Sequence, residues 1–149
     1  MLLNVGAIVG GLSFGTWSER VGRRRAMIVA ALLALPCIPL WAYGGSLLLL
    51  GLGAFLIQVM VHGAWGVVPT YLNELSPDDV RGTLPGFAYQ LGNLLAAGTA
   101  TVQSWLAEQH GGDYAVVMAI WMAAVAALLA LLAWLGSEVR GIGFGTQRS

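Results

Sequence analysis

The sequence has few charged residues and no lysine. Of its 149 residues, 9% are charged and 58% are hydrophobic, and the mean hydropathy is +0.77. A soluble domain spreads charge over its surface, whereas a membrane protein confines charge to its loops. The formal net charge is zero, which argues against a nucleic-acid-binding protein because such proteins need a basic face. The composition therefore indicates a membrane protein.

The sequence also has little cysteine, and its N-terminal segment lacks cations. Cys37 is the one cysteine and lies in an apolar run, so the chain has no disulfide framework. The chain is apolar from Met1 to Phe14, and the positive leader of a secretory signal is missing, so no signal peptide is expected. No Ser/His/Asp set, carboxylate pair or metal-ligand cluster is apparent. We therefore expect no enzyme, no cofactor and no metal site.

Long apolar segments make up most of the chain. They cover about residues 2–17, 26–43, 47–72, 82–106 and 114–135. Only helices and closed barrels satisfy the backbone in lipid, and the segments lack the alternation of barrel strands. We predict an all-α membrane fold in which residues 1–136 form one bundle of five transmembrane helices. Residues 137–149 would form a cytoplasmic tail.

The arginines give this bundle an orientation. With five spans, every arginine falls on the same side of the membrane: Arg20, Arg23, Arg24, Arg25, Arg81, Arg140 and Arg148. Positive residues collect in cytoplasmic loops, so that side is predicted to be cytoplasmic. We therefore expect a multi-pass protein of the cell membrane (inner or plasma membrane) whose C-terminus lies in the cytoplasm.

Polar residues inside the spans gather in the third and fourth segments. Such residues are costly in lipid and usually face a protein interior or a water-filled path. Residues three or four apart share a helix face, and the fourth segment repeats this spacing at Tyr89, Asn93, Ala97 and Thr101. We predict that both segments line a path for substrate or protons. The candidate residues are Gln58, His62, Trp65, Tyr89, Gln90 and Asn93.

His62 is the one ionisable side chain well inside a predicted span. An imidazole gains and loses a proton near neutral pH, which suits proton transfer. The alternative is a neutral imidazole that hydrogen-bonds between helices. The sequence leaves both interpretations open.

Four glycines of the first segment, Gly6, Gly10, Gly11 and Gly15, include two pairs spaced four apart. Small residues at this spacing let the backbones of two membrane helices approach closely. Gly6 with Gly10 and Gly11 with Gly15 therefore predict a tight helix–helix contact.

The turn after the first segment carries an arginine-rich motif. Residues 15–24 read Gly-Thr-Trp-Ser-Glu-Arg-Val-Gly-Arg-Arg, which resembles the loop signature of the major facilitator superfamily, with Glu19 at the usual aspartate position. The resemblance implies that this loop gates the cytoplasmic side, and that Glu74 forms an ion pair there with Arg20, Arg23 or Arg24. The gating residues implied are Gly15, Glu19, Arg20, Gly22, Arg23, Arg24, Glu74 and Arg81.

A second resemblance is narrower. Residues 65–77 read Trp-Gly-Val-Val-Pro-Thr-Tyr-Leu-Asn-Glu-Leu-Ser-Pro, and residues 80–83 and 89–94 read Val-Arg-Gly-Thr and Tyr-Gln-Leu-Gly-Asn-Leu. These stretches resemble helices ten and eleven of the sialate:proton symporter family, and most of all the Jen-type lactate and pyruvate permeases. The five segments would then correspond to helices eight to twelve, which form most of the C-terminal half of such a transporter.

This resemblance implies proton-coupled uptake of a small carboxylate such as lactate or pyruvate. Such transporters alternate access between two related halves around a shared site. The implied partners are the lipid bilayer, the carboxylate, the proton and an N-terminal half with the first seven helices. The chain alone would then be inactive. Two alternatives stay open: a small membrane scaffold that binds a partner without transport, and a truncated reading frame without activity.

Overall fold

The computed structural model describes residues 1–138. Within that range the chain forms six α-helices and one short 3₁₀ helix, η1, and no strand. The elements are α1 (Leu2–Val21), α2 (Arg23–Tyr43), α3 (Leu47–Leu75), η1 (Asp78–Val80), α4 (Leu84–Ala96), α5 (Thr99–Gln109) and α6 (Tyr114–Leu135). The predicted all-α fold is confirmed. The tail predicted at 137–149 lies, from residue 139 onward, outside the described residues.

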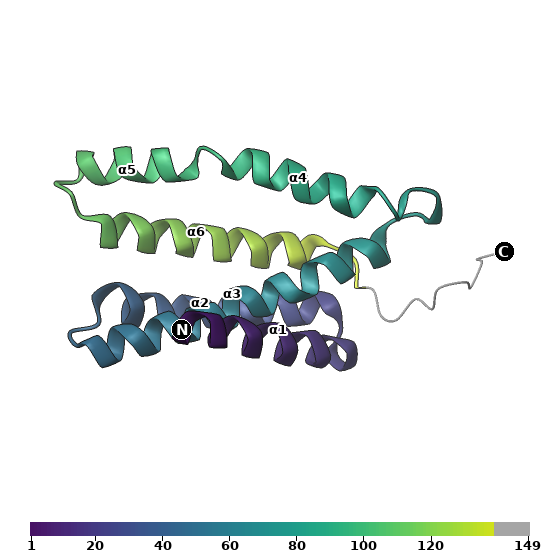
Figure 1. Ribbon diagram of the computed structural model, residues 1–149. Coiled ribbons are helices and arrows are strands. Elements are labelled where there is room, and N and C mark those ends of the chain that lie inside the picture. The colour runs from purple at the N-terminus through teal and green to yellow at the C-terminus, as the bar shows by residue number, and fades with distance from the viewer. Residues whose placement is uncertain (139–149) are drawn as a thin grey trace.

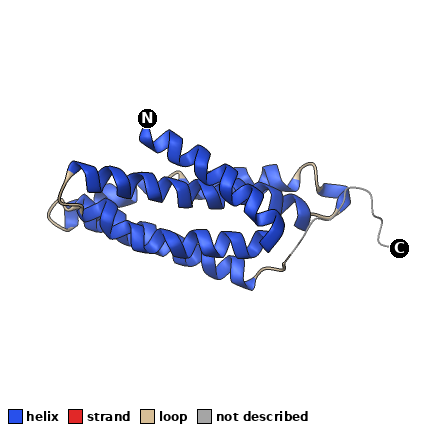
Figure 2. Ribbon diagram, turned by 90° about the horizontal axis from the view of Figure 1, so that it is seen from below, coloured by secondary structure: helices blue, strands red, loops and turns tan. Residues whose placement is uncertain are grey.

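The helices run along a common long axis (Figures 1 and 2). Helix α3 packs against both α1 and α2, α6 packs on α2, and α5 packs on α6. One end of the bundle holds the α1–α2 turn, the α3–α4 connection and the end of α6, and the other end holds the α2–α3 and α5–α6 turns (Figure 1). The arginine-rich turn and the α3–α4 connection therefore share one end, as the five-span prediction requires.

Within residues 1–138, three helices are long and apolar enough to cross a membrane: α2 with 21 residues, α3 with 29 and α6 with 22. The fourth predicted span is instead two helices, α4 with 13 residues and α5 with 11, separated at Ala97 and Gly98. Glycine is a weak helix former, which explains a break at this point. Together α4 and α5 run the length of the bundle (Figure 1). The five-span count itself stays a prediction.

Backbone contact joins α1 to α3. A Cβ placed on Gly6 would lie 2.8 Å from the carbonyl oxygen of Phe55, and one on Gly10 would lie 2.8 Å from Val59 Cα. The predicted tight contact is confirmed at this pair. At the second pair Gly66 of α3 approaches Gly11, whereas a Cβ on Gly15 would meet nothing within 4 Å. The expectation of a tight contact at Gly15 was wrong, because a side chain at that position would have open space around it.

The main apolar core lies toward the end with the arginine-rich turn. It combines buried side chains of α1, α2, α3 and α6: Phe14, Ala26, Met27, Ala30, Ala64, Val67, Tyr71 and Ala133. Half of these are alanines, so the helix backbones lie close together there. This packing fixes the end of α1, the start of α2 and the end of α3 relative to one another, and so positions the polar groups described next.

Candidate functional site

Arg23, the first residue of α2, is the centre of the polar end. Its Nε donates to Glu74 Oε1 at 3.2 Å, and its Nη1 donates to Ser18 Oγ at 2.6 Å. Ser18 Oγ in turn donates to the carbonyl oxygen of Gly15 at 2.6 Å. The side chains of Arg23 and Glu74 are only 12% and 13% exposed. The expected ion pair is therefore present, with Arg23 as the arginine that forms it.

Arg81 fastens the connection that follows α3. Its Nε donates to the carbonyl oxygen of Asn73 at 3.1 Å, and its Nη2 donates to that of Ser76 at 3.3 Å. Its Nη1 lies 2.7 Å from Asp78 Oδ1. The last carbonyls of a helix have no partner within it, so a cation at this position stabilises the helix end. Arg81 therefore holds the last turn of α3, which carries Glu74.

Glu138 belongs to the same end, although the sequence interpretation did not include it. Its Oε1 accepts a hydrogen bond from the backbone N–H of Arg24 at 3.3 Å, so a carboxylate lies at the positive end of α2. Gly22 has φ 103°, which favours glycine, and any side chain on it would collide with the Glu138 carboxylate. Tyr71 Oη donates to the carbonyl oxygen of Ser137 at 2.8 Å. No sequence motif indicates the role of Glu138, because the backbone N–H of Arg24 that it binds is far away in the sequence.

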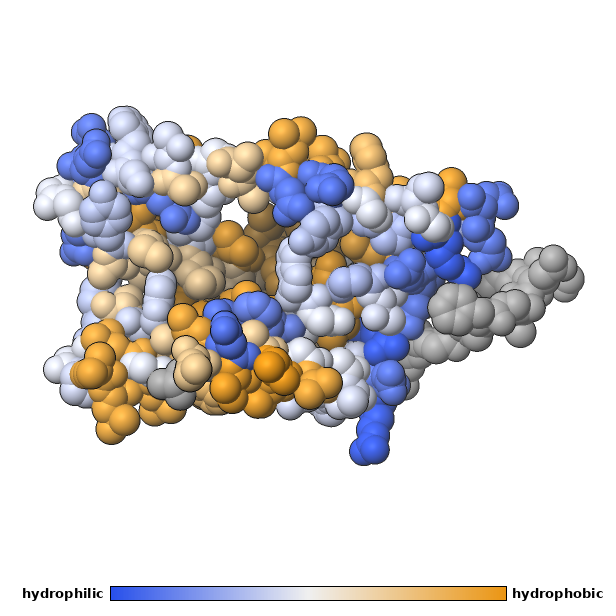
Figure 3. Space-filling view, viewed as in Figure 1, coloured by the Kyte–Doolittle hydropathy of each residue, from blue (hydrophilic) through white to orange (hydrophobic). Residues whose placement is uncertain are grey.

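The structure brings together some of the eight predicted gating residues but not all of them. Gly15, Gly22, Arg23 and Glu74 belong to one connected cluster, with Arg81 on the adjoining connection. Glu19 and Arg20 are exposed, and Arg24 contributes its backbone N–H. In a space-filling view, hydrophilic side chains gather over this end of the bundle (Figure 3).

Four of the six predicted pathway residues form two pairs, one between α3 and α4 and one on α4. The rings of Trp65 on α3 and Tyr89 on α4 lie 5.6 Å apart at 58°. On α4, Asn93 Nδ2 donates to Gln90 Oε1 at 3.4 Å, and both side chains are exposed. A pocket of ≈ 240 Å³ opens beside the two rings and is lined by Trp65, Val68, Pro69, Leu72, Pro85, Gly86 and Tyr89. The stripe predicted through Ala97 and Thr101 does not continue on one helix, because α4 ends at Ala96.

Gln58 and His62 lie on the side of α3 that meets α1. A Cβ on Gly6 would lie 3.2 Å from Gln58 Cβ, and one on Gly11 would lie 3.9 Å from the carbonyl oxygen of His62. His62 Nδ1 is buried and has no hydrogen-bond partner within the described part of the chain. The structure therefore separates this pair from the Trp65–Tyr89 contact. Both interpretations of His62 stay open.

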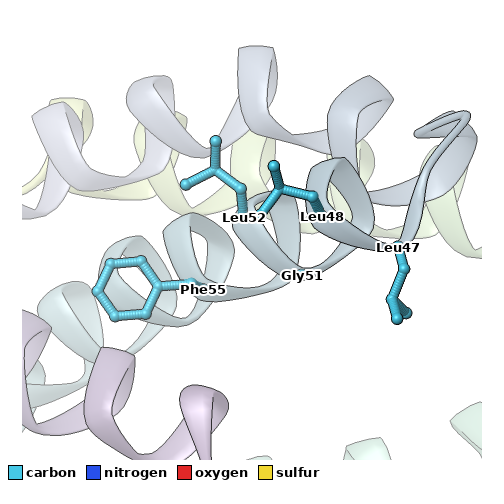
Figure 4. Close-up of a pocket in the computed structure, with 5 residues that line it drawn as sticks. All are labelled: Leu47, Leu48, Gly51, Leu52 and Phe55. Carbon is cyan, nitrogen blue, oxygen red and sulfur yellow. The ribbon is translucent and has the colours of Figure 1, made fainter.

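A larger pocket of ≈ 650 Å³ lies at the start of α3 and is lined by Leu47, Leu48, Gly51, Leu52 and Phe55. In Figure 4 the side chains of Leu48 and Leu52 point to the same side of the helix. These residues offer only hydrocarbon, so this pocket has no group that could orient a polar solute. Within residues 1–138, no three His, Cys, Asp or Glu side chains come together to hold a metal ion.

The family described as "Sugar (and other) transporter" matches residues 1–138. The helical bundle and this match define the class: the chain is part of a transporter family of the major facilitator superfamily. The chain belongs to the sugar (and other) transporter family.

Individual relatives include transporters of different solutes. The chain is 36% identical over 133 residues to a carboxylic acid transporter protein homolog of Saccharomyces cerevisiae, which covers 80% of the chain and 21% of that protein. It is 36% identical over 80 residues to the glucose transporter GlcP of Staphylococcus epidermidis, covering 54% of the chain and 18% of that protein. The probable metabolite transport protein CsbC of Bacillus subtilis is 34% identical over 87 residues, covering 56% of the chain and 18% of that protein. The chain thus spans about a fifth of the length of these relatives.

Proposed function

We propose that the chain forms most of the C-terminal half of a secondary transporter that couples uptake of a small carboxylate to protons. The observation that carries this proposal is the share of the chain that aligns with one relative. The carboxylic acid transporter homolog aligns with 80% of the chain, whereas the glucose transporter GlcP aligns with 54%. A likeness that extends over nearly the whole bundle supports a shared architecture and a related solute.

The polar end supplies a gate for alternating access in this proposal. Arg23 and Glu74 are largely buried and join the α1–α2 turn to the last turn of α3. Separating a buried pair leaves a charge without its partner and is costly. The cluster therefore favours the state in which these helix ends are together, and opening that side requires a compensating event such as solute binding. By the positive-inside rule this end faces the cytoplasm.

The solute path lies along α3 and α4. Gln90 and Asn93 are exposed on α4 next to the Trp65–Tyr89 contact, and their amides can donate hydrogen bonds to a carboxylate. His62, one face away on α3, carries the proton in this scheme. Seven further helices, on the same chain or another, complete the opposite wall of the path.

Sugar transport is a second candidate. The glucose transporter GlcP is 36% identical to the chain, and amide side chains such as Gln90 and Asn93 also bind sugar hydroxyls. This candidate differs from the first in its solute, which carries no carboxylate.

Uptake measurements distinguish the candidates. The chain is co-expressed with the seven complementary helices in cells without lactate or glucose uptake, and radiolabelled lactate, pyruvate and glucose are supplied separately. We expect lactate or pyruvate to accumulate, more at acidic than at neutral external pH, and the chain without its complement to give none. Glucose uptake without carboxylate uptake would contradict the proposal, and uptake of neither solute would favour the scaffold alternative.

A further inference from the structure

The α1–α2 turn carries more positive charge than its ion pairs neutralise. Four arginines lie within six positions, at Arg20, Arg23, Arg24 and Arg25. Arg23 is held by Glu74, but the guanidinium groups of the other three form no ion pair within residues 1–138. Arg20 and Arg25 are exposed and Arg24 is partly exposed. The turn therefore presents unpaired cations at the surface.

The position of this turn relative to the apolar helices matters as much as its charge. The arginines directly precede the apolar run of α2, which is long and apolar enough to span a membrane. Cations at that position lie at the depth of the lipid headgroups. The unsatisfied N–H groups at the start of α2 add positive partial charge at the same place.

A surface pocket lies beside Arg20. It has a volume of ≈ 440 Å³ and is lined by Thr16, Trp17, Glu19 and Arg20 at the end of α1. Trp17 is 39% exposed, and its ring is held edge-on against Phe14, with centroids 5.8 Å apart at 85°. Tryptophan prefers the membrane–water interface, where its ring contacts lipid and its N–H contacts the headgroup. The pocket thus combines an interfacial aromatic ring and a guanidinium with the carboxylate of Glu19 and a Thr16 hydroxyl that donates to the α1 backbone.

We infer that the α1–α2 turn binds the headgroup of an anionic phospholipid. Arg20 and Arg25 contact the lipid phosphate, and Trp17 packs against the glycerol region and upper acyl chain. Guanidinium groups bind phosphate oxygens in a forked geometry, which suits this ligand. The bilayer is the source of the anion because the pocket lies next to the spanning helix. This surface is separate from the Arg23–Glu74 gate, since it uses the arginines that the gate leaves unpaired.

Native mass spectrometry of the full chain in a neutral detergent tests this inference. The chain is titrated with phosphatidylglycerol and, separately, with phosphatidylcholine of the same acyl chains. We expect the first phosphatidylglycerol to bind several times more tightly than phosphatidylcholine. Substituting Arg20→Gln and Arg25→Gln together is expected to lower the phosphatidylglycerol affinity by roughly fivefold per arginine and leave phosphatidylcholine unchanged. The double variant should fold normally, because neither guanidinium has a partner within residues 1–138.

Two controls make the test specific. Arg81→Gln also removes one positive charge, but Arg81 is bound to Asp78 and to the end of α3. It should keep the lipid preference, and a loss of roughly fivefold in this variant, equal to the loss per arginine in the double variant, would contradict the inference, because the effect would then be one of net charge. Glycerol 1-phosphate added at millimolar concentration should not displace the lipid. Displacement by this soluble anion, or an unchanged preference in the double variant, would overturn the inference.

Discussion

Arg23 Nε lies 3.2 Å from Glu74 Oε1, and this contact joins residues 51 positions apart in the sequence. Ser18 Oγ accepts a hydrogen bond from Arg23, and Arg81 binds the end of α3, which carries Glu74. The contact connects the turn after α1 to the end of α3, while the intervening α2 and the body of α3 are almost wholly apolar. The contact therefore belongs to a group of polar interactions at one end of the bundle.

Removing either member of this pair should destabilise the bundle. For Glu74→Gln we expect a loss of about 1–3 kcal/mol in the free energy of unfolding, because Arg23 then stays buried without a carboxylate. The measurement is a double-mutant cycle with Arg23→Gln and Glu74→Gln, using reversible unfolding in mixed micelles. A coupling free energy near zero between the two substitutions would show that the pair does not form.

The glycine contact between α1 and α3 offers a matched comparison within one helix. In Gly10→Ala the new methyl group would meet the backbone of Val59, so α1 must move away from α3. We expect a loss of about 1–3 kcal/mol in stability from this overpacking. Gly15→Ala is the control, since its methyl group has open space and alanine favours the helix by up to about 1 kcal/mol. Equal effects of the two substitutions would contradict the packing described for α1.

Cysteine labelling tests the orientation. In a Cys37→Ala background, Glu108→Cys lies in the exposed end of α5 and Asp79→Cys lies in the exposed η1 segment at the opposite end of the bundle. We expect an impermeant maleimide to label Glu108→Cys in intact cells, and Asp79→Cys only after the membrane is opened. The reverse pattern would place the arginine-rich turn outside the cell.

His62 provides a prediction that separates proton coupling from packing. In the assembled transporter, His62→Ala should abolish accumulation of lactate against a gradient and retain exchange of lactate across the membrane. The reason is that exchange needs no net proton movement, whereas accumulation does. Accumulation equal to that of the unmodified transporter would assign His62 to packing between α1 and α3.

Much of this architecture could be predicted from the sequence, because apolar length and charge position carry physical meaning in a membrane. The apolar segments that became α2, α3 and α6 are examples, whereas the pairing of Glu74 with a nearby arginine was implied by the resemblance to the major facilitator superfamily. The break at Ala97 and Gly98 could not be predicted from apolar length, since the segment stays apolar through it. Glu138 could not be found either, because its partner is the backbone N–H of Arg24, 114 positions away.

The candidate path was harder to predict than the gate. Spacing placed Gln58, His62 and Trp65 on one face of α3, and a helix face is wide enough to meet two neighbours. In the structure Gln58 and His62 lie beside α1, whereas Trp65 contacts Tyr89 of α4. Periodicity identifies which residues share a face, but the position of the neighbouring helix decides which of them meet.

Proton movement measured together with lactate movement tests the central proposal most directly. The chain and its seven complementary helices are reconstituted in liposomes that contain a fluorescent pH indicator, and lactate is added outside. The proposal predicts rapid internal acidification that parallels entry of radiolabelled lactate and exceeds the slow leak of protein-free liposomes. Lactate entry without acidification beyond that leak, or glucose entry in place of lactate, would contradict it.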